Sequence, residues 1–199
     1  MTDRRPFVFH RQHNQQQYNI HTHMNNQYLM DHLRCIPDFP QKGILFRDVT
    51  TLFKDGKCLE VMEDEMYELY KDKGITKVVG IESRGFIMGA IFARRLGAGL
   101  TLCRKPGKLP AEVISQTYSK EYGTDTIEIH KDAITEDDVV LLHDDLLATG
   151  GTIKAAWDLV RKFHPKKVYM SFIIEIRDEG LRGREFLGDE ADITTLISV

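Results

Sequence analysis

The segment from Val139 to Phe163 constrains the fold more than any other part of this chain. Val139–Leu142 is a continuous apolar run, of the kind that a parallel sheet buries on both faces. Ile153–Phe163 follows after a glycine-containing loop, and its apolar residues recur at helical spacing. A buried strand that leads through a short loop into an amphipathic helix is the repeating unit of an α/β fold.

The same alternation extends along most of the chain. Apolar spacing predicts helices over Cys58–Lys73 and Phe86–Leu96, and strands over Lys77–Ile81, Gly99–Cys103 and Lys167–Ile174. Because parallel strands are joined by right-handed crossovers, alternating strands and helices place helices on both faces of one sheet. We therefore expect an α/β fold whose central sheet is mainly parallel and flanked by helices.

Two segments depart from this pattern. Residues 1–28 are rich in Gln, Asn and His and have little apolar content, so we expect a disordered N-terminal extension followed by one domain over residues 29–199. Arg104–Ile129 is a long excursion with a basic start and two polar strand-like pieces on either side of Ser115–Gly123. A long excursion inside a compact domain is usually a functional flap or lid.

Composition excludes several classes of protein. The net charge is -3, which predicts no general attraction to nucleic acid or to a membrane surface. No apolar run approaches the about 18 residues of a membrane span. The three cysteines, Cys35, Cys58 and Cys103, are odd in number and widely spaced, which argues against a disulfide framework and a CxxC metal site. We expect reduced thiols in a cytoplasmic protein.

The strongest chemical signal follows the Val139–Leu142 strand. Asp144 and Asp145 come at the carboxyl end of this strand, which is the edge of a parallel sheet where ligands bind. The loop Ala148–Thr152 reads Ala-Thr-Gly-Gly-Thr and opens the next helix, so its backbone N–H groups and hydroxyls suit a phosphate monoester. The two acids suit sugar hydroxyls or a magnesium-bound partner.

A second anion site is expected at two other strand ends. Ser83 and Arg84 follow the Lys77–Ile81 strand and open a helix, so N–H groups and a guanidinium converge there. Arg104, Lys105 and Lys108 form a basic cluster in the loop after the Gly99–Cys103 strand. On the residues alone, this cluster fits a solvated surface equally well.

These motifs, taken in order, resemble the type I phosphoribosyltransferases and, more narrowly, the adenine phosphoribosyltransferases. The resemblance rests on Val139–Thr152, which contains the two acids and the glycine loop, and on five further segments: Pro37–Pro40, Gly43–Asp48, Gly80–Phe86, Arg104–Pro110 and Tyr118–Gly123. It runs from about Ile36 to about Leu187 and implies the fold of that family, with a small hood and a flexible flap.

The resemblance assigns roles to these residues. It implies that Ala148, Thr149, Gly150, Gly151 and Thr152 bind the 5-phosphate of 5-phosphoribosyl-1-pyrophosphate and that Asp144 and Asp145 bind its ribose hydroxyls. Pyrophosphate would contact Ser83, Arg84, Arg104, Lys105 and Lys108. Adenine would be read by the Leu45 backbone, stacked on Phe46 and approached by Arg47.

The implied reaction joins adenine to the sugar, giving AMP and pyrophosphate. Glu121 would act as acid and base at adenine N7, Arg84 and Lys105 would stabilise the leaving group, and Tyr122 would help to close the flap. Mg²⁺ is expected mostly on substrate oxygens and water, with no metal ligand assigned to the protein. The family is usually homodimeric, so we expect a homodimer.

One residue departs from the family motif. His143 stands where the motif is ordinarily apolar, and because side chains alternate along a strand we expect it to pack rather than to reach the ligand.

Three other functions are alternatives to adenine phosphoribosyltransferase. They are a phosphoribosyltransferase for a 6-oxopurine or xanthine, a non-catalytic regulator that senses sugar phosphates, and a dinucleotide-binding protein. No G-x-G-x-x-G motif supports the last.

Overall fold

The computed structural model describes residues 25–119, 123–177 and 180–199, and it contains two compact units. The first unit is Met1–Val61 and the second is Met62–Val199. Residues 1–24, most of the expected extension, lie outside the described residues, and residues 25–32 are helical. The expected boundary at residues 28 and 29 therefore lies inside a helix, and the division into extension and domain stays a prediction.

The first unit contains a two-stranded antiparallel sheet. Strand β1 (Arg34–Pro37) pairs with β2 (Leu45–Asp48), and the peptide bond between Phe39 and Pro40 in the connecting loop is cis. The short helix α2 (Thr50–Phe53) begins directly after β2, because the Asp48 carboxylate accepts hydrogen bonds from the Thr50 N–H and hydroxyl. Helix α3 (Gly56–Tyr70) starts in this unit and ends in the second.

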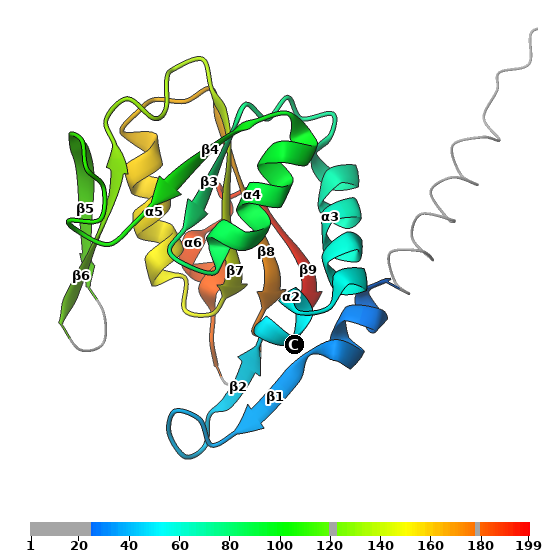
Figure 1. Cartoon of the computed structure of the whole chain (residues 1–199). Coiled ribbons are helices and arrows are strands. Elements are labelled where there is room, and N and C mark those ends of the chain that lie inside the picture. Colours follow the sequence, from blue (N-terminus) through cyan, green and yellow to red (C-terminus); the bar gives the residue numbers. More distant parts are fainter. Residues whose placement is uncertain (1–24, 120–122, 178–179) are drawn as a thin grey trace, which may run out of the picture. The chain divides into compact units, whose positions relative to one another are not determined.

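A five-stranded parallel sheet forms the centre of the second unit (Figure 1). Its strands are β3 (Lys77–Ile81), β4 (Gly99–Cys103), β7 (Val139–Leu147), β8 (Lys167–Glu175) and β9 (Ile193–Ser198). They lie in the order β4-β3-β7-β8-β9, and every neighbouring pair is parallel. The expected mainly parallel sheet is thereby confirmed.

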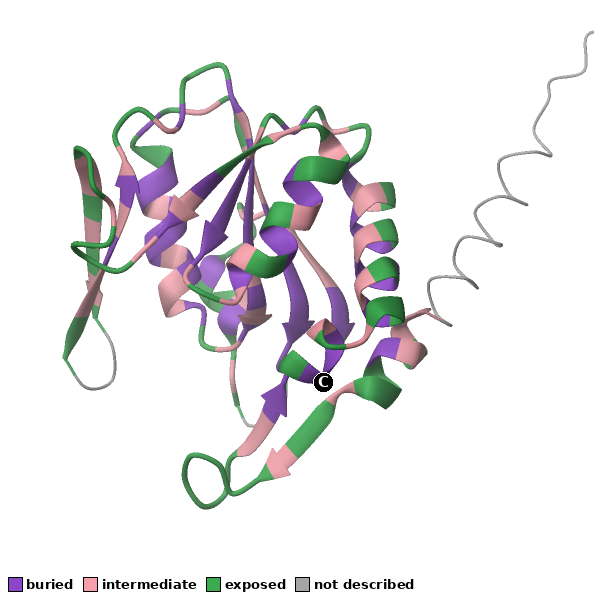
Figure 2. Ribbon diagram, viewed as in Figure 1, coloured by how far each residue is buried: buried purple, intermediate pink, exposed green. Residues whose placement is uncertain are grey.

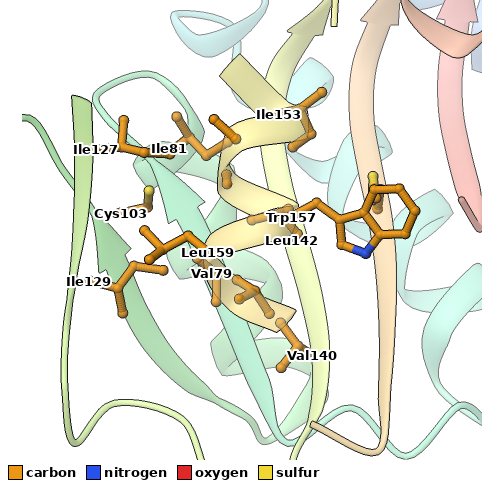
Figure 3. Close-up of a cluster of buried hydrophobic side chains, with 14 of the residues drawn as sticks. Val79, Ile81, Cys103, Ile127, Ile129, Val140, Leu142, Ile153, Trp157 and Leu159 are labelled. Carbon is orange, nitrogen blue, oxygen red and sulfur yellow. The ribbon is translucent and has the colours of Figure 1, made fainter. Parts of the chain in front are cut away.

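Helices α4 (Gly85–Leu96) and α5 (Gly151–Arg161) cover opposite faces of this sheet. Alternation along β7 sends Val140 and Leu142 into the core under α5, where they join Leu159 and Trp157 (Figure 3). His143, one residue further along, faces α4. Figure 2 shows that the strands between the two helices are mostly buried.

The expected flap region is an antiparallel hairpin beside α5. Its strands are β5 (Val113–Ser119) and β6 (Thr124–His130), and Ile127 and Ile129 of β6 pack into the core under α5. The interpretation of Ser115–Gly123 as the link between two strands was wrong in part, because β5 continues to Ser119. Tyrosine and threonine have high strand propensity, and the alternation of exposed and half-buried residues fits a two-stranded ribbon.

A short helix and the thiols complete the described structure. Helix α6 (Gly183–Leu187) lies between β8 and β9 in the chain. The cysteines are all free; Cys58 and Cys103 are buried and Cys35 is exposed. Among the residues that the structure describes, no helix has the length and apolarity needed to cross a membrane.

Candidate active site

The carboxyl ends of β3, β4 and β7 enclose a cavity of about 390 Å³ in the second unit. Parallel strands end at the same edge of a sheet, and this is why residues from three separate motifs meet here. Of the residues predicted to bind the sugar diphosphate, those that line this cavity are Ser83, Arg84, Arg104, Lys105, Asp144, Asp145 and Thr152.

The loop after β7 forms a smaller cavity of about 110 Å³ next to the first. It is lined by the whole predicted phosphate loop, Ala148–Thr152, and shares Asp144 and Thr152 with the larger cavity. Gly150 caps α5 in the left-handed conformation, with φ of 85°, which a residue with a side chain adopts at a cost. The N–H groups of the first turn of a helix have no partner within the helix, so this end of α5 is suited to binding an anion.

The two acids of β7 form a tightly coupled pair. Asp145 is 3% exposed, and its Oδ2 lies 2.6 Å from Nε of Arg84. The Asp145 N–H donates to Oδ1 of Asp144 at 2.9 Å. Burial, together with the neighbouring Asp145 charge, raises the pKa of Asp144 well above its ordinary value. The pair thus offers one carboxylate neutralised by arginine and one that holds a proton more readily, both suited to hydrogen bonds with hydroxyl groups.

The turn from β3 into α4 brings Arg84 to this pair. The Glu82–Ser83 peptide bond is cis, and Arg84 is the N-cap residue of α4. A Cβ on Gly85 would lie 2.8 Å from the His143 carbonyl oxygen, so only glycine allows the helix to approach β7 this closely. This close approach of the Gly85 backbone to β7 fixes the position of Arg84 at the start of α4.

Glu82 holds the basic loop after β4 in place. Its carboxylate accepts from Arg104 Nη2 at 2.9 Å, from Arg104 Nε at 3.2 Å, and from the Lys105 N–H at 2.9 Å. The hydrogen bonds from Arg104 and from Lys105 hold the pKa of Glu82 below its usual range. The sequence analysis includes Glu82 in the Gly80–Phe86 motif but assigns it no role. Its position, one residue past the end of β3, was the available signal.

Two residues of the hairpin reach into the same cavity and were missed in the sequence analysis. The Lys105 ammonium forms an ion pair with Asp125, and the Tyr118 hydroxyl lies 3.2 Å from the Thr152 hydroxyl. Tyr118 and Asp125 stand directly opposite each other in the hairpin. No spacing rule in the sequence brings these residues to the site, because the hairpin register and its packing on α5 place them there.

One residue predicted to bind pyrophosphate is not part of the cavity lining. Lys108 is exposed in the basic loop and is absent from the cavity lining, although its backbone carbonyl accepts from Arg104 Nη1 at 3.2 Å. Glu121 and Tyr122 lie outside the described residues, so their roles stay predictions.

The predicted adenine-binding residues lie on β2, in the first unit. The Leu45 carbonyl accepts a hydrogen bond from Arg47 Nη1 at 3.0 Å. The Phe46 ring packs edge-on against Phe39, with centroids 5.1 Å apart. Leu45 also pairs with Pro37 of β1, so the backbone of this strand is held in a fixed extended form.

His143 packs inside the protein, as its position in the strand predicts. It is fully buried; its ring meets Phe92 of α4 edge-on at 4.9 Å, and its Nδ1 lies 2.9 Å from the Ser171 hydroxyl. Burial lowers the pKa of His143 to about 3, so the ring is neutral at physiological pH.

Oxygen ligands for a hard cation are present but are paired with basic groups. Asp145 is paired with Arg84, Asp125 with Lys105, and Glu82 with Arg104. Within residues 25–119, 123–177 and 180–199, no group of three or more His, Cys, Asp or Glu side chains is placed to hold a metal ion. This donor set fits a Mg²⁺ ion that is carried mainly by substrate oxygens and water.

Comparison with known proteins decides the family. The model of the phosphoribosyl transferase domain matches residues 48–182. An adenine phosphoribosyltransferase of Bacteroides thetaiotaomicron is 62% identical over 176 residues, which cover 88% of this chain and 99% of that protein. The chain belongs to the adenine phosphoribosyltransferase family.

Solved structures of this family agree with the fold. The adenine phosphoribosyltransferase of Rhodothermus marinus superposes with a TM-score of 0.82 at 42% identity, over 89% of this chain and 99% of that one. The Saccharomyces cerevisiae adenine phosphoribosyltransferase, solved with adenine and an imino-altritol bisphosphate, gives 0.80 at 37% identity, over 88% and 99%. The fold expected from the sequence motifs is thereby confirmed.

Proposed function

We propose that this chain acts in purine salvage, transferring the 5-phosphoribosyl group of 5-phosphoribosyl-1-pyrophosphate to adenine and releasing AMP and pyrophosphate. The observation that carries the proposal is the cavity at the ends of β3, β4 and β7, which joins an acid pair, three basic side chains and a helix N-terminus. Each part of the sugar diphosphate has a matching group in this arrangement.

The phosphoribosyl group is held by β7 and its loop. The 5-phosphate binds in the smaller cavity to the N–H groups and hydroxyls of Ala148–Thr152. The ribose 2- and 3-hydroxyls bind Asp144, which lines both cavities, and Asp145, which lines the larger one. Because Asp145 is already fixed by Arg84, the sugar meets an acceptor that needs little reorganisation.

The diphosphate leaving group is stabilised by the basic side chains across the cavity. Arg84, Arg104 and Lys105 all line it, and so does Ser83. As the bond from ribose C1 to the diphosphate lengthens, negative charge grows on the leaving oxygen, and cations held in place stabilise it more than they stabilise the substrate. Lys108 in the same loop adds to the positive potential.

Adenine is recognised by β2 through backbone groups. The Leu45 carbonyl accepts from Arg47, and since a carbonyl oxygen has two lone pairs it can also accept from the adenine N6 amine while the Leu45 N–H donates to N1. Phe46 supplies the stacking face. Hypoxanthine and guanine present the reverse pattern at these two atoms, and two mismatched polar pairs cost several kcal/mol, which disfavours the 6-oxopurine alternative.

Proton transfer at the base is assigned by resemblance to Glu121. A carboxyl group at adenine N7 shares a proton with the ring as N9 bonds to the sugar. Tyr122, in the same motif, is assigned to closing the site and excluding water that would otherwise hydrolyse the activated sugar.

Magnesium and a second subunit complete the proposal. Mg²⁺ bound to the diphosphate would neutralise part of its charge, and the carboxylates of Glu82, Asp125, Asp144 and Asp145 line the same cavity. We further propose that the protein is a cytoplasmic homodimer. Light scattering of the purified chain tests the dimer: twice the mass of one chain is expected, and a single-chain mass at assay concentration contradicts it.

Product analysis with different bases tests the function. The chain is incubated with the sugar diphosphate, Mg²⁺ and either adenine, hypoxanthine, guanine or xanthine, and nucleotide formation is followed. We expect AMP from adenine and at least about 100-fold less product from the others. Turnover of hypoxanthine without turnover of adenine would reject the assignment, and tight nucleic-acid binding without pyrophosphate release would favour a regulator.

A further inference from the structure

One cross-strand pair of the hairpin contacts both the basic loop and the predicted phosphate loop. Tyr118 and Asp125 are opposite one another in the β5–β6 ladder, and the Tyr118 hydroxyl lies 3.5 Å from Asp125 Oδ2. Asp125 forms an ion pair with Lys105 of the basic loop. Tyr118 lies within hydrogen-bond distance of Thr152 in the phosphate loop. A ligand that fills the cavity therefore competes with the hairpin for the Lys105 ammonium and the Thr152 hydroxyl.

The Lys105–Asp125 pair differs from the other ion pairs of the cavity. Arg104 is held by a bidentate contact to Glu82, and Arg84 is held by the buried Asp145. The Lys105 side chain is 50% exposed and the Asp125 side chain is 16% exposed. An ammonium on a flexible stem with three rotatable donors exchanges partners more easily than a guanidinium held in a planar fork.

The backbone of Lys105 is fixed independently of its side chain. Its N–H donates to Glu82, and the preceding residue Arg104 pairs through its own N–H and C=O with Glu128 of β6. Asp125 therefore decides where the ammonium goes without being needed to hold the loop. Its Oδ1 accepts from the Thr126 N–H at 2.9 Å, a contact that an asparagine at this position keeps.

We propose that Asp125 is a positioning residue that holds the Lys105 ammonium in the cavity and is displaced from it by the diphosphate of the substrate. This rests on the proposed function of the cavity. A carboxylate at this place competes with the diphosphate for the same cation and repels it, so it weakens binding of both the sugar diphosphate and the product pyrophosphate. Asp125 also favours release of pyrophosphate, because the Lys105 ammonium pairs with it again as the product leaves.

Calorimetric titration with inorganic pyrophosphate tests the proposal, with and without Mg²⁺. The variants are Asp125→Asn, which removes only the charge, and Asp125→Glu, which restores it. Asp137→Asn is the matched control, since Asp137 is 91% exposed and pairs with Lys166 outside the cavity. We expect Asp125→Asn to bind pyrophosphate about five- to tenfold more tightly than the wild-type chain. Asp125→Glu and Asp137→Asn should stay within about twofold of the wild type.

Steady-state kinetics supply a readout that a loss of stability does not mimic. In Asp125→Asn we expect KM for the sugar diphosphate to fall by a similar factor while KM for adenine stays unchanged. Unchanged or weaker pyrophosphate binding in Asp125→Asn would overturn the proposal, as would tightening of equal size in Asp137→Asn. If the wild-type chain binds no pyrophosphate, the proposed function of the cavity fails instead.

Discussion

Replacing Gly183 with alanine should displace the predicted phosphate loop. A Cβ on Gly183 would lie 2.3 Å from the Ala148 carbonyl oxygen and 2.9 Å from Cδ1 of Leu147. The first distance is about 1 Å short of the 3.4 Å at which ordinary contact begins. The oxygen belongs to the backbone, so a rotamer change cannot relieve the clash.

The movement should fall on the loop rather than on α6. Arg184, the next residue of the helix, donates to Glu175 through Nε and Nη2, both at 2.9 Å, and to the Ile193 carbonyl at 3.2 Å. With α6 held by these contacts, the loop carries most of the 1 Å shift. Overpacking of this kind costs about 1–3 kcal/mol of stability. A 1 Å misplacement of a binding group reduces activity by up to about 100-fold.

Kinetics of Gly183→Ala and Gly56→Ala test this reasoning. Gly56, the first residue of α3, is the matched control, because a Cβ there would meet nothing within 4 Å. For Gly183→Ala we expect KM for the sugar diphosphate to rise about 10- to 100-fold, with KM for adenine within about twofold. A Gly183→Ala variant with wild-type KM for the sugar diphosphate would refute the assignment of the loop.

Three further predictions concern single side chains. The Arg184 hydrogen bonds lower the pKa of Glu175 to about 2. The ionised Glu175 therefore stabilises the fold fully above about pH 4.5, and this contribution is lost as the pH falls toward 2. In acid unfolding we expect the wild-type chain to lose about 3 kcal/mol of unfolding free energy over this range, a loss that Glu175→Gln does not show. His143→Leu should keep kcat within about threefold between pH 6 and 8 while lowering stability by about 1–2 kcal/mol, measured by denaturant unfolding, because the neutral ring only packs and bonds Ser171. Glu121→Gln should lower kcat by about 100-fold or more and change pyrophosphate affinity little; a variant with full kcat contradicts its acid–base role.

Much of the second unit could be predicted because its sequence signals are local. The predicted strands Lys77–Ile81 and Gly99–Cys103 match β3 and β4 residue for residue. Each short apolar run ends at a charged residue, Glu82 or Arg104, which marks the end of the strand. Gly97 closes α4 in the left-handed conformation, with φ of 69°, as its place after the apolar stripe indicates.

The strand β7 was predicted too short for a physical reason. The apolar pattern stops at Leu142, whereas β7 continues to Leu147 through the polar residues of the motif. These polar groups stay in the strand because His143 bonds Ser171 and Asp145 pairs with Arg84. Polar residues held by tertiary partners are invisible to a pattern that counts only apolar positions.

The detailed pairing of the site could not be predicted at all. The family resemblance implies that Lys105 and Arg84 approach a diphosphate, but it does not indicate that Asp125 and Asp145 pair with them. Lys105 and Asp125 are brought together by the hairpin register, a long-range feature without a local sequence signal. The same holds for α6, which contacts the predicted phosphate loop through Gly183 and is joined to β8 by the Glu175–Arg184 ion pair.

A crystal structure of this chain with AMP tests the central claim most directly, because AMP carries the sugar phosphate and the base together. We predict that its phosphate lies within hydrogen-bond distance of the N–H groups of Gly150, Gly151 and Thr152, with the ribose hydroxyls on Asp144 and Asp145. A phosphate bound at the basic loop around Lys105 instead, with the loop after β7 empty, would contradict the account.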